Sequence, residues 1–254
     1  MFFELIKAYF ALALSLKFLS VADLAYGWGI LDREVFLILW ITIFILLGFY
    51  LLGKIRFPHE EKKQHISIFR RFLGIVSFTF VIYLIPGFWG APLKSISAFA
   101  PPLYTQNFFI HRQSHISFND FDEGMNYAKK EKKPVLVNFS GHGCVNCRKM
   151  EASVWTDEQV NSILTNDVVL ITLFVDDKKK LDTPIIIEEN GKKRTLETIG
   201  DRNSYLQRVK FGANAQPFYV LLNNEGSPLE KAYVFDENPQ NFVAFLEKGL
   251  KNYN

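Results

Sequence analysis

The chain has two cysteines, Cys144 and Cys147, three residues apart in G-H-G-C-V-N-C-R-K-M, residues 141–150. The apolar run before them, residues 134–140, predicts a strand. A helix opening at Cys144 would offer free backbone N–H groups and partial positive charge, which favour a thiolate. Cys147 would lie one turn further on the same face. The spacing predicts a reactive dithiol in which Cys144 attacks a disulfide and Cys147 resolves the mixed disulfide.

Three other interpretations of the cysteine pair stay open. A structural disulfide would close a very short loop, so its gain in loop entropy would be small. A zinc site needs four ligands, and His142 with the two cysteines supplies three. The third alternative is a pair of inert buried thiols. Redox chemistry at a dithiol requires neither a metal nor an organic cofactor, and we expect none.

Pro217 begins a second apolar run, after F-G-A-N-A-Q. A cis bond before Pro217 would bring the backbone beside Gln216 close to the cysteines and leave a strand edge for a substrate peptide. A trans proline that starts a strand is the alternative. Gln216 and His142 are therefore candidates for substrate docking, and His142 is also a candidate for tuning the thiolate.

The first part of the chain predicts membrane helices. Residues 35–53 and 72–93 contain no charged residue, and each is near the roughly 20 residues that cross a bilayer as a helix. Residues 1–20 are apolar but carry Glu4, Lys7 and Lys17. We expect a third span there, with the lysines reaching toward its ends; an interfacial helix is the alternative. The membrane region is thus expected over residues 1–93, with helices at about 1–22, 35–53 and 72–90.

Basic residues predict the orientation of these helices. Loops rich in Lys and Arg stay cytoplasmic. The loop between the two uncharged runs holds six such residues: Lys54, Arg56, Lys62, Lys63, Arg70 and Arg71. The N-terminus is therefore expected in the cytoplasm and everything after about residue 93 outside. The net charge of +3 follows mostly from this topology and gives no case for nucleic-acid binding.

After the membrane region we expect a connector and then an α/β domain. Residues 94–116 lack periodicity and contain Pro101-Pro102, which predicts an extended linker whose His111 and His115 are solvated rather than metal ligands. From residue 117 to 254 strands alternate with helices, which predicts a mixed sheet covered by helices. Thr156 opens T-D-E-Q, a capping-box pattern for a helix. Asn190-Gly191 predicts the turn of a hairpin insertion at about 183–198.

Two stretches carry a family resemblance. P-V-L-V-N-F-S-G-H-G-C-V-N-C-R-K-M-E and F-G-A-N-A-Q-P-F-Y-V-L-L resemble a thioredoxin fold. With L-K-F-L-S, G-W-G-I-L-D-R-E-V-F and L-L-G-K-I-R-F-P-H, the whole chain resembles the C-terminal part of the membrane-bound thiol:disulfide interchange proteins of the DsbD type. The resemblance implies Cys144 as nucleophile, Cys147 as resolving thiol and Pro217 as cis-proline. It also implies electron flow from the cytoplasm through membrane cysteines to periplasmic acceptors.

The chain departs from that family in two ways. Asn138 stands where such domains usually carry a buried aspartate, and an amide cannot titrate. The family's second acid is matched by Glu151, four residues after Cys147. We hypothesise that Glu151 makes the proton transfer that Asn138 cannot; an exposed surface glutamate is the alternative. In addition, no cysteine precedes Cys144, so we expect a longer protein or a separate cysteine-bearing membrane donor.

The combined prediction is three transmembrane helices followed by a thioredoxin-like α/β domain on the periplasmic side of a bacterial inner membrane. It would pass reducing equivalents to oxidised periplasmic thiol proteins such as isomerases, cytochrome c maturation factors or peroxide-reducing proteins. A disulfide-forming oxidase or isomerase would use the same residues. A membrane assembly subunit with a static disulfide is the interpretation without catalysis.

Overall fold

The structure is a computed structural model that describes residues 2–56, 66–107, 115–189 and 191–253. Two compact units divide the chain: residues 1–22 with 29–111, and residues 23–28 with 112–254. The N-terminal helices are α1 (Phe2–Tyr26), α2 (Arg33–Leu51) and α3 (Ile68–Leu84), the last continued by a 3-10 turn at Ile85–Trp89. All three are long and apolar enough to cross a membrane. The predicted basic residues Lys62 and Lys63 lie outside the described residues.

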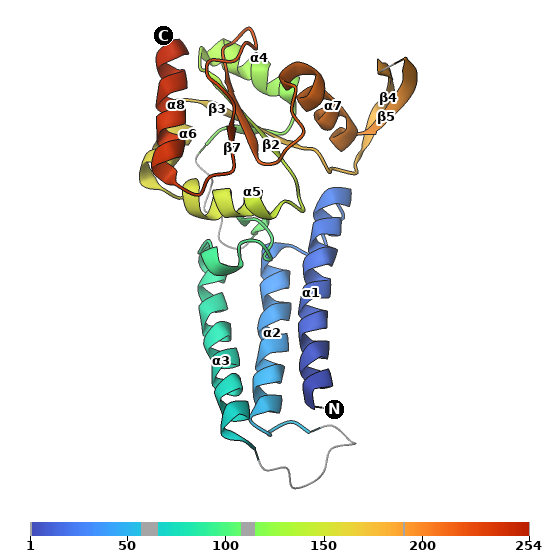
Figure 1. The fold of residues 1–254 in the computed structure, drawn as a ribbon, viewed down its shortest axis with the longest axis vertical. Helices are drawn as coiled ribbons and strands as arrows, with labels where there is room; N and C mark the ends of the chain where they lie inside the picture. Colours follow the sequence, from blue (N-terminus) through green and yellow to red (C-terminus); the bar gives the residue numbers. More distant parts are fainter. Residues whose placement is uncertain (1, 57–65, 108–114, 190, 254) are drawn as a thin grey trace. The chain divides into compact units, whose positions relative to one another are not determined.

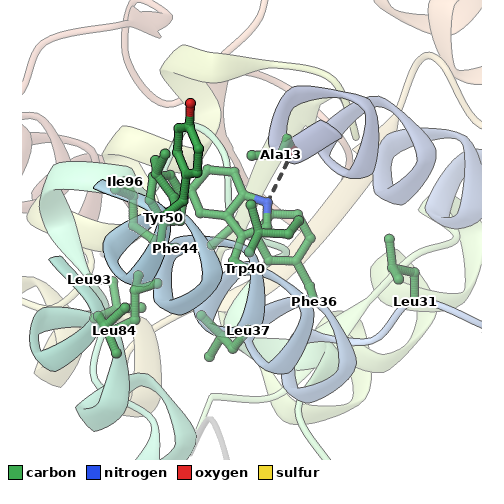
Figure 2. Packing of buried hydrophobic residues seen from close by; sticks show 14 of the residues in the cluster. Ala13, Leu31, Phe36, Leu37, Trp40, Phe44, Tyr50, Leu84, Leu93 and Ile96 are labelled. Carbon is green, nitrogen blue, oxygen red and sulfur yellow. Dashed lines mark hydrogen bonds between the residues drawn. The ribbon is translucent and has the colours of Figure 1, made fainter. Parts of the chain in front are cut away.

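Aromatic side chains and a few polar groups pack the helical unit. Trp40 of α2 makes tilted ring contacts with Phe36 and Phe44 and donates its indole N–H to the carbonyl of Ala13 at 3.1 Å (Figure 2). Ser77 of α3 donates to the carbonyl of Phe44 at 2.7 Å. In an apolar surrounding each such hydrogen bond satisfies a group that has no water to bind, so these bonds fix how the helices face one another.

Residues 94–107 differ from the extended linker that the sequence predicts. They form 3-10 turns at Lys94–Ile96 and Leu103–Thr105, and Ile96 and Ala100 are buried in the core of the helical unit. The guanidinium of Arg33, itself buried, donates to the carbonyl of Pro101 at 2.5 Å and to that of Ala91 at 2.9 Å. This segment is therefore packed against the start of α2.

The second unit is an α/β domain built on a five-stranded sheet (Figure 1). Its elements are β1 (Ser117–Phe118), α4 (Phe121–Glu131), β2 (Val135–Ser140), α5 (Val145–Lys149), a π-helical turn (Met150–Val154), α6 (Glu158–Asn166), β3 (Val169–Phe174), β4 (Lys180–Glu189), β5 (Lys192–Thr198), α7 (Ile199–Phe211), β6 (Phe218–Leu222), β7 (Tyr233–Val234) and α8 (Pro239–Tyr253). The strand order is β1-β3-β2-β6-β7, with β1, β3 and β2 parallel and β6 and β7 antiparallel to their neighbours.

Alternating side chains of the central strands fill two cores, one on each face of the sheet. Leu136 and Leu170 pack with residues of the π-helical turn, α6 and α8. Val137 and Ile171 pack on the opposite face with residues of α4 and α7. This is the mixed sheet covered by helices that the sequence predicts. The strands β4 and β5 form a separate two-stranded hairpin, whose predicted turn residue Asn190 lies outside the described residues.

Two local predictions need correction. The N-cap of α6 is Asp157, whose carboxylate accepts the N–H groups of Gln159 and Val160; Thr156 instead donates its hydroxyl to the carbonyl of Ala152 at 3.0 Å. His115 is not solvated, because it is buried with its ring edge-on to Trp155. Burial lowers the pKa of His115. His111 lies outside the described residues.

Candidate dithiol site

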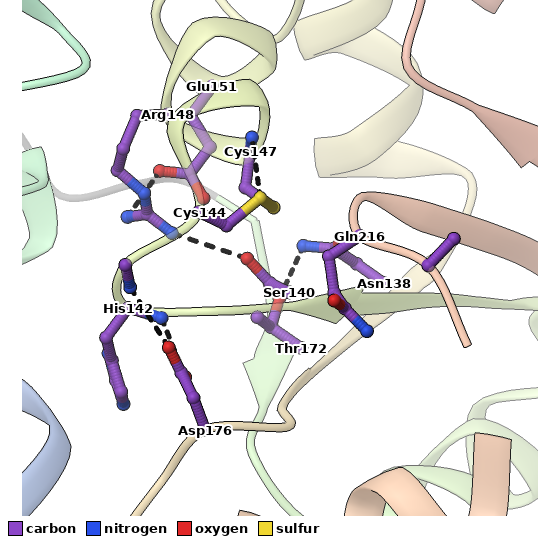
Figure 3. The surroundings of a disulfide bond; sticks show 12 residues. Asn138, Ser140, His142, Cys144, Cys147, Arg148, Glu151, Thr172, Asp176 and Gln216 are labelled. Carbon is purple, nitrogen blue, oxygen red and sulfur yellow. Dashed lines mark hydrogen bonds and ion pairs between the residues drawn. A yellow bond between two sulfur atoms is a disulfide. The ribbon is translucent and has the colours of Figure 1, made fainter.

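Cys144 and Cys147 form a disulfide at the start of α5, directly after the loop that follows β2 (Figure 3). Cys144 is the N-cap of α5, as the sequence predicts for a cysteine that opens a helix, and its sulfur accepts the N–H of Cys147 at 3.1 Å. Cys144 is half-buried, whereas Cys147 is 1% exposed. An incoming protein can therefore reach the sulfur of Cys144 far more easily than that of Cys147.

Asp176 anchors the loop that carries the cysteines. Its carboxylate, just beyond the end of β3, accepts the backbone N–H of His142 at 2.8 Å and that of Gly143 at 3.0 Å. Gly141 allows this approach, since a Cβ there would lie 3.1 Å from a carboxylate oxygen of Asp176. Sequence reasoning missed Asp176, which lies two residues beyond the end of β3. Because the carboxyl ends of adjacent parallel strands meet at one edge of a sheet, a carboxylate after β3 could have been predicted to lie near the loop after β2.

A buried ion pair lies on the helix of the two cysteines. Arg148, whose side chain is 5% exposed, places its guanidinium 2.8 Å from the carboxylate of Glu151, whose side chain is 19% exposed. A second guanidinium nitrogen lies 3.4 Å from the hydroxyl of Ser140. The pKa of Glu151 is raised overall, because burial raises it by more than the charge of Arg148 lowers it. Glu151 is thus largely buried rather than the exposed surface residue of the alternative interpretation. Arg148 was not predicted.

Asn138 lies in the middle of β2, below the cysteine loop, and is 1% exposed. Its amide nitrogen donates weakly to the hydroxyl of Thr172 on β3 at 3.5 Å. Within the part of the chain that the structure describes, its carbonyl oxygen has no hydrogen-bond partner. The position is therefore polar and buried, but its side chain cannot exchange a proton at neutral pH.

His142 is buried, although the sequence suggested a role in docking. Its imidazole stacks on Phe174 with ring centroids 4.1 Å apart and lies 3.9 Å from the carboxylate of Asp177. Figure 3 shows the ring directed away from the disulfide. Burial opposes ionisation of Asp177, yet the imidazole and the N–H and charge of Lys179 lower its pKa overall. The ring of His142 is therefore part of the packing below the loop, not of an exposed docking face.

Pro217 is buried at the start of β6, and the peptide bond between Gln216 and Pro217 is cis, as the family resemblance implies. Gln216 is half-buried, and its amide donates to the side chain of Gln207 on α7 at 3.2 Å. Gln207, which is fully buried, donates in turn to the carbonyl of Ala215 at 2.8 Å. Gln207, which sequence reasoning missed, therefore holds the loop before Pro217 in place.

The chemistry available at this site is that of the two sulfurs. No group of three or more His, Cys, Asp or Glu side chains among the described residues is arranged to hold a metal ion. The site offers one half-buried cysteine at a helix start, one buried cysteine, and one largely buried carboxylate in the π-helical turn that continues α5. A thiolate at the reachable position is the species that attacks a disulfide.

Three solved structures are similar to this chain at low sequence identity. The chain is similar to the solved structure of a DsbH oxidoreductase, with 17% identity, coverage of 54% of this chain and 85% of that chain, and a TM-score of 0.40. A thioredoxin from Thermus thermophilus gives 19% identity, 53% and 86% coverage and a TM-score of 0.38. A redox protein from Chlamydomonas reinhardtii gives 12% identity, 93% and 63% coverage and a TM-score of 0.34. No curated protein matches the sequence. Residues 117–224 match the family model described as thioredoxin-like, so three apolar helices are followed here by a thioredoxin-like α/β domain.

Proposed function

We propose that this protein is a membrane-anchored thiol:disulfide oxidoreductase that reduces oxidised thiol proteins outside the cytoplasm. The observation that carries the proposal is the unequal exposure of the two cysteines in a thioredoxin-like domain: Cys144 is half-buried at the start of α5 and Cys147 is buried. A structural disulfide does not need an accessible sulfur, whereas a thiol:disulfide exchange reaction does.

The reaction balances without a cofactor. The Cys144 thiolate attacks a partner disulfide, forming a mixed disulfide and releasing one partner thiolate. Cys147 then loses its proton and attacks the sulfur of Cys144, which releases the second partner thiolate. The partner gains two electrons, and the cysteine pair becomes the disulfide seen here. We propose that Glu151 accepts the proton of Cys147.

A further reduction step must then return the pair to its dithiol form. The chain has no other cysteine, so the donor is proposed to be a dithiol in another membrane segment or chain. The basic loop between α2 and α3 supports a cytoplasmic N-terminus and a periplasmic domain, as in the DsbD-type proteins that the sequence resembles. Downstream acceptors would be oxidised periplasmic thiol proteins, including those of cytochrome c maturation.

The test is the reduction potential of the cysteine pair in the full chain, held in detergent and equilibrated with glutathione or dithiothreitol buffers. A potential of about −270 to −200 mV fits a reductant supplied from the membrane. A value near about −120 mV would assign an oxidase and reverse the electron flow. A pair that stays oxidised below about −300 mV would be a structural staple.

Replacement of the resolving thiol gives an independent test. In Cys147→Ala, a reductase stalls after the first attack, so mixed disulfides between Cys144 and partner proteins should accumulate. Cys144→Ala should accumulate none, because the buried sulfur of Cys147 cannot reach a partner. An assembly subunit with a static disulfide would yield no mixed disulfides from either variant.

A further inference from the structure

The Arg148–Glu151 pair poses a physical problem that a surface ion pair does not. Both side chains are largely buried, and taking a charge out of water is strongly unfavourable unless a partner compensates for it. A buried carboxylate without a cation therefore takes up a proton and becomes neutral. A neutral carboxyl already holds the proton that a general base has to accept.

Arg148 is the neighbour of Glu151 that favours its charged form over the neutral form that burial favours. Tyr219 on β6 faces the pair from the sheet; it is 1% exposed, and burial and the charge of Glu151 both raise its pKa, so it stays neutral. Lys149 is the next cation along the helix, but its ammonium pairs with Glu237 at 3.0 Å, at the surface. The guanidinium of Arg148, at 2.8 Å, is the cation in direct contact with the carboxylate.

The orientation of Arg148 is itself fixed. Its backbone follows Cys147 directly in α5, its N–H donates to the carbonyl of Cys144 at 3.2 Å, and its guanidinium reaches Ser140 at the end of β2. Figure 3 shows Arg148, Glu151 and the disulfide grouped around the first turns of this helix. A cation held by both the helix and the strand can hold the carboxylate at one place beside the cysteines.

We propose that Arg148 is a positioning residue of the dithiol: it favours the charged form of the buried Glu151 side chain and holds this side chain in place, so that its carboxylate can accept the proton of Cys147. In that step the S–H bond of Cys147 breaks and an O–H bond forms on Glu151. The Cys147 thiolate then attacks Cys144, and the partner thiolate leaves. The negative charge moves from carboxylate to thiolate beside one fixed cation. This inference rests on the proposed function, because it assigns a role within the resolving step.

The experiment uses the reduced full chain in detergent with 5,5′-dithiobis(2-nitrobenzoate) as the disulfide. Attack by Cys144 releases one coloured thiolate, and resolution by Cys147 releases a second, so stopped-flow absorbance separates the two steps. The variants are Arg148→Met, Glu151→Gln and the double variant. Lys149→Met is the matched control, since it removes a cation of the same charge from the neighbouring, exposed position.

Only the second phase should respond to these variants. We expect Arg148→Met to slow it about 10- to 100-fold near pH 6, relative to the unmodified chain, with the difference closing as the pH rises and Glu151 ionises without its cation. Glu151→Gln should stay slow through the neutral range, and the double variant should be no slower than Glu151→Gln alone. Lys149→Met should leave both phases unchanged. Arg148→Lys, which keeps the charge, should recover part of the rate.

Three results would overturn the inference. One is that the rate of the second phase in Arg148→Met, divided by the same rate in the unmodified chain, does not change with pH. Another is a double variant slowed by the product of the two single effects. The third is an equal loss in Lys149→Met. Failure of the proposed function looks different, because it would show in the reduction potential of the unmodified chain and would leave the rates of the two phases and their pH dependence as they are. A structural role of Arg148 would lower the yield of folded protein without a pH-dependent ratio.

Discussion

Asp176 is expected to hold the cysteine loop in place through two hydrogen bonds, and removing its carboxylate tests this. Its carboxylate accepts the N–H groups of His142 and Gly143 at 2.8 and 3.0 Å. A hydrogen bond to a charged group contributes about 1.5 to 3 kcal/mol. Gly143 is exposed, so water replaces most of its bond when the carboxylate is removed, whereas the N–H of the buried His142 loses its partner. We expect Asp176→Ala to lower the free energy of unfolding of the thioredoxin-like domain by about 2 to 4 kcal/mol.

The assay is pulse proteolysis of the full chain across a urea series in detergent, which reports the unfolded fraction without spectroscopic interference from the apolar helices. Hydrogen exchange of peptides spanning residues 141–147 should accelerate in the same variant. Asp176→Asn keeps one acceptor oxygen and should lose roughly half as much stability. Asp182→Ala removes the same charge from an exposed position on β4 and should change little.

A loss below about 0.5 kcal/mol in Asp176→Ala, equal to that of Asp182→Ala, would refute the anchor. Unchanged hydrogen exchange of residues 141–147 in Asp176→Ala would also refute the anchor. A lower free energy of unfolding would then come from elsewhere in the domain.

Three further outcomes follow from buried groups of the same domain. Gly200→Ala should destabilise it by about 2 kcal/mol despite the helix propensity of alanine, because the added Cβ would lie 2.6 Å from the carbonyl oxygen of Asp177; urea unfolding measures this. Asn138→Asp should cost about 2 to 4 kcal/mol at neutral pH and less in acid, since a carboxylate there is buried without a cation; unfolding at both pH values checks it. Because the pKa of Glu151 is raised, the folded state binds its proton more tightly, so stability should fall as pH rises above about 4.5. Glu151→Gln should remove that slope, although Arg148 then lacks its anion.

Most predictions that depend on local sequence agree with the structure. The uncharged runs at 35–53 and 72–93 coincide largely with α2 and α3, because a bilayer helix is specified by length and apolarity alone. The cysteine loop could be predicted because a strand followed by a helix start is a local pattern. The N-cap of α6 was wrong by one residue: Thr156 and Asp157 are both good caps, and the choice depends on how the preceding π-helical turn ends.

Contacts between distant segments account for what the sequence did not predict. Residues 94–107 have no periodicity, which predicts an extended linker, but the carbonyl of Pro101 in this segment accepts a hydrogen bond from Arg33, 68 residues earlier. Asp176 and the loop it anchors are 33 or 34 residues apart. The burial of His142 depends on Phe174, which the parallel pairing of β2 with β3 brings beside it.

The site separates two requirements that a single buried aspartate would have to meet together. The position of the cysteine loop is fixed from β3, where Asp176 binds only backbone N–H groups. The charge balance depends on side chains of the cysteine helix itself, Arg148 and Glu151. With an amide at Asn138, the strand contributes a polar side chain that does not titrate. A change at Asp176 should therefore alter loop order with little effect on the pH profile of resolution, and a change at Arg148 should do the reverse. Variants that altered both properties in parallel would show that position and charge are one coupled network.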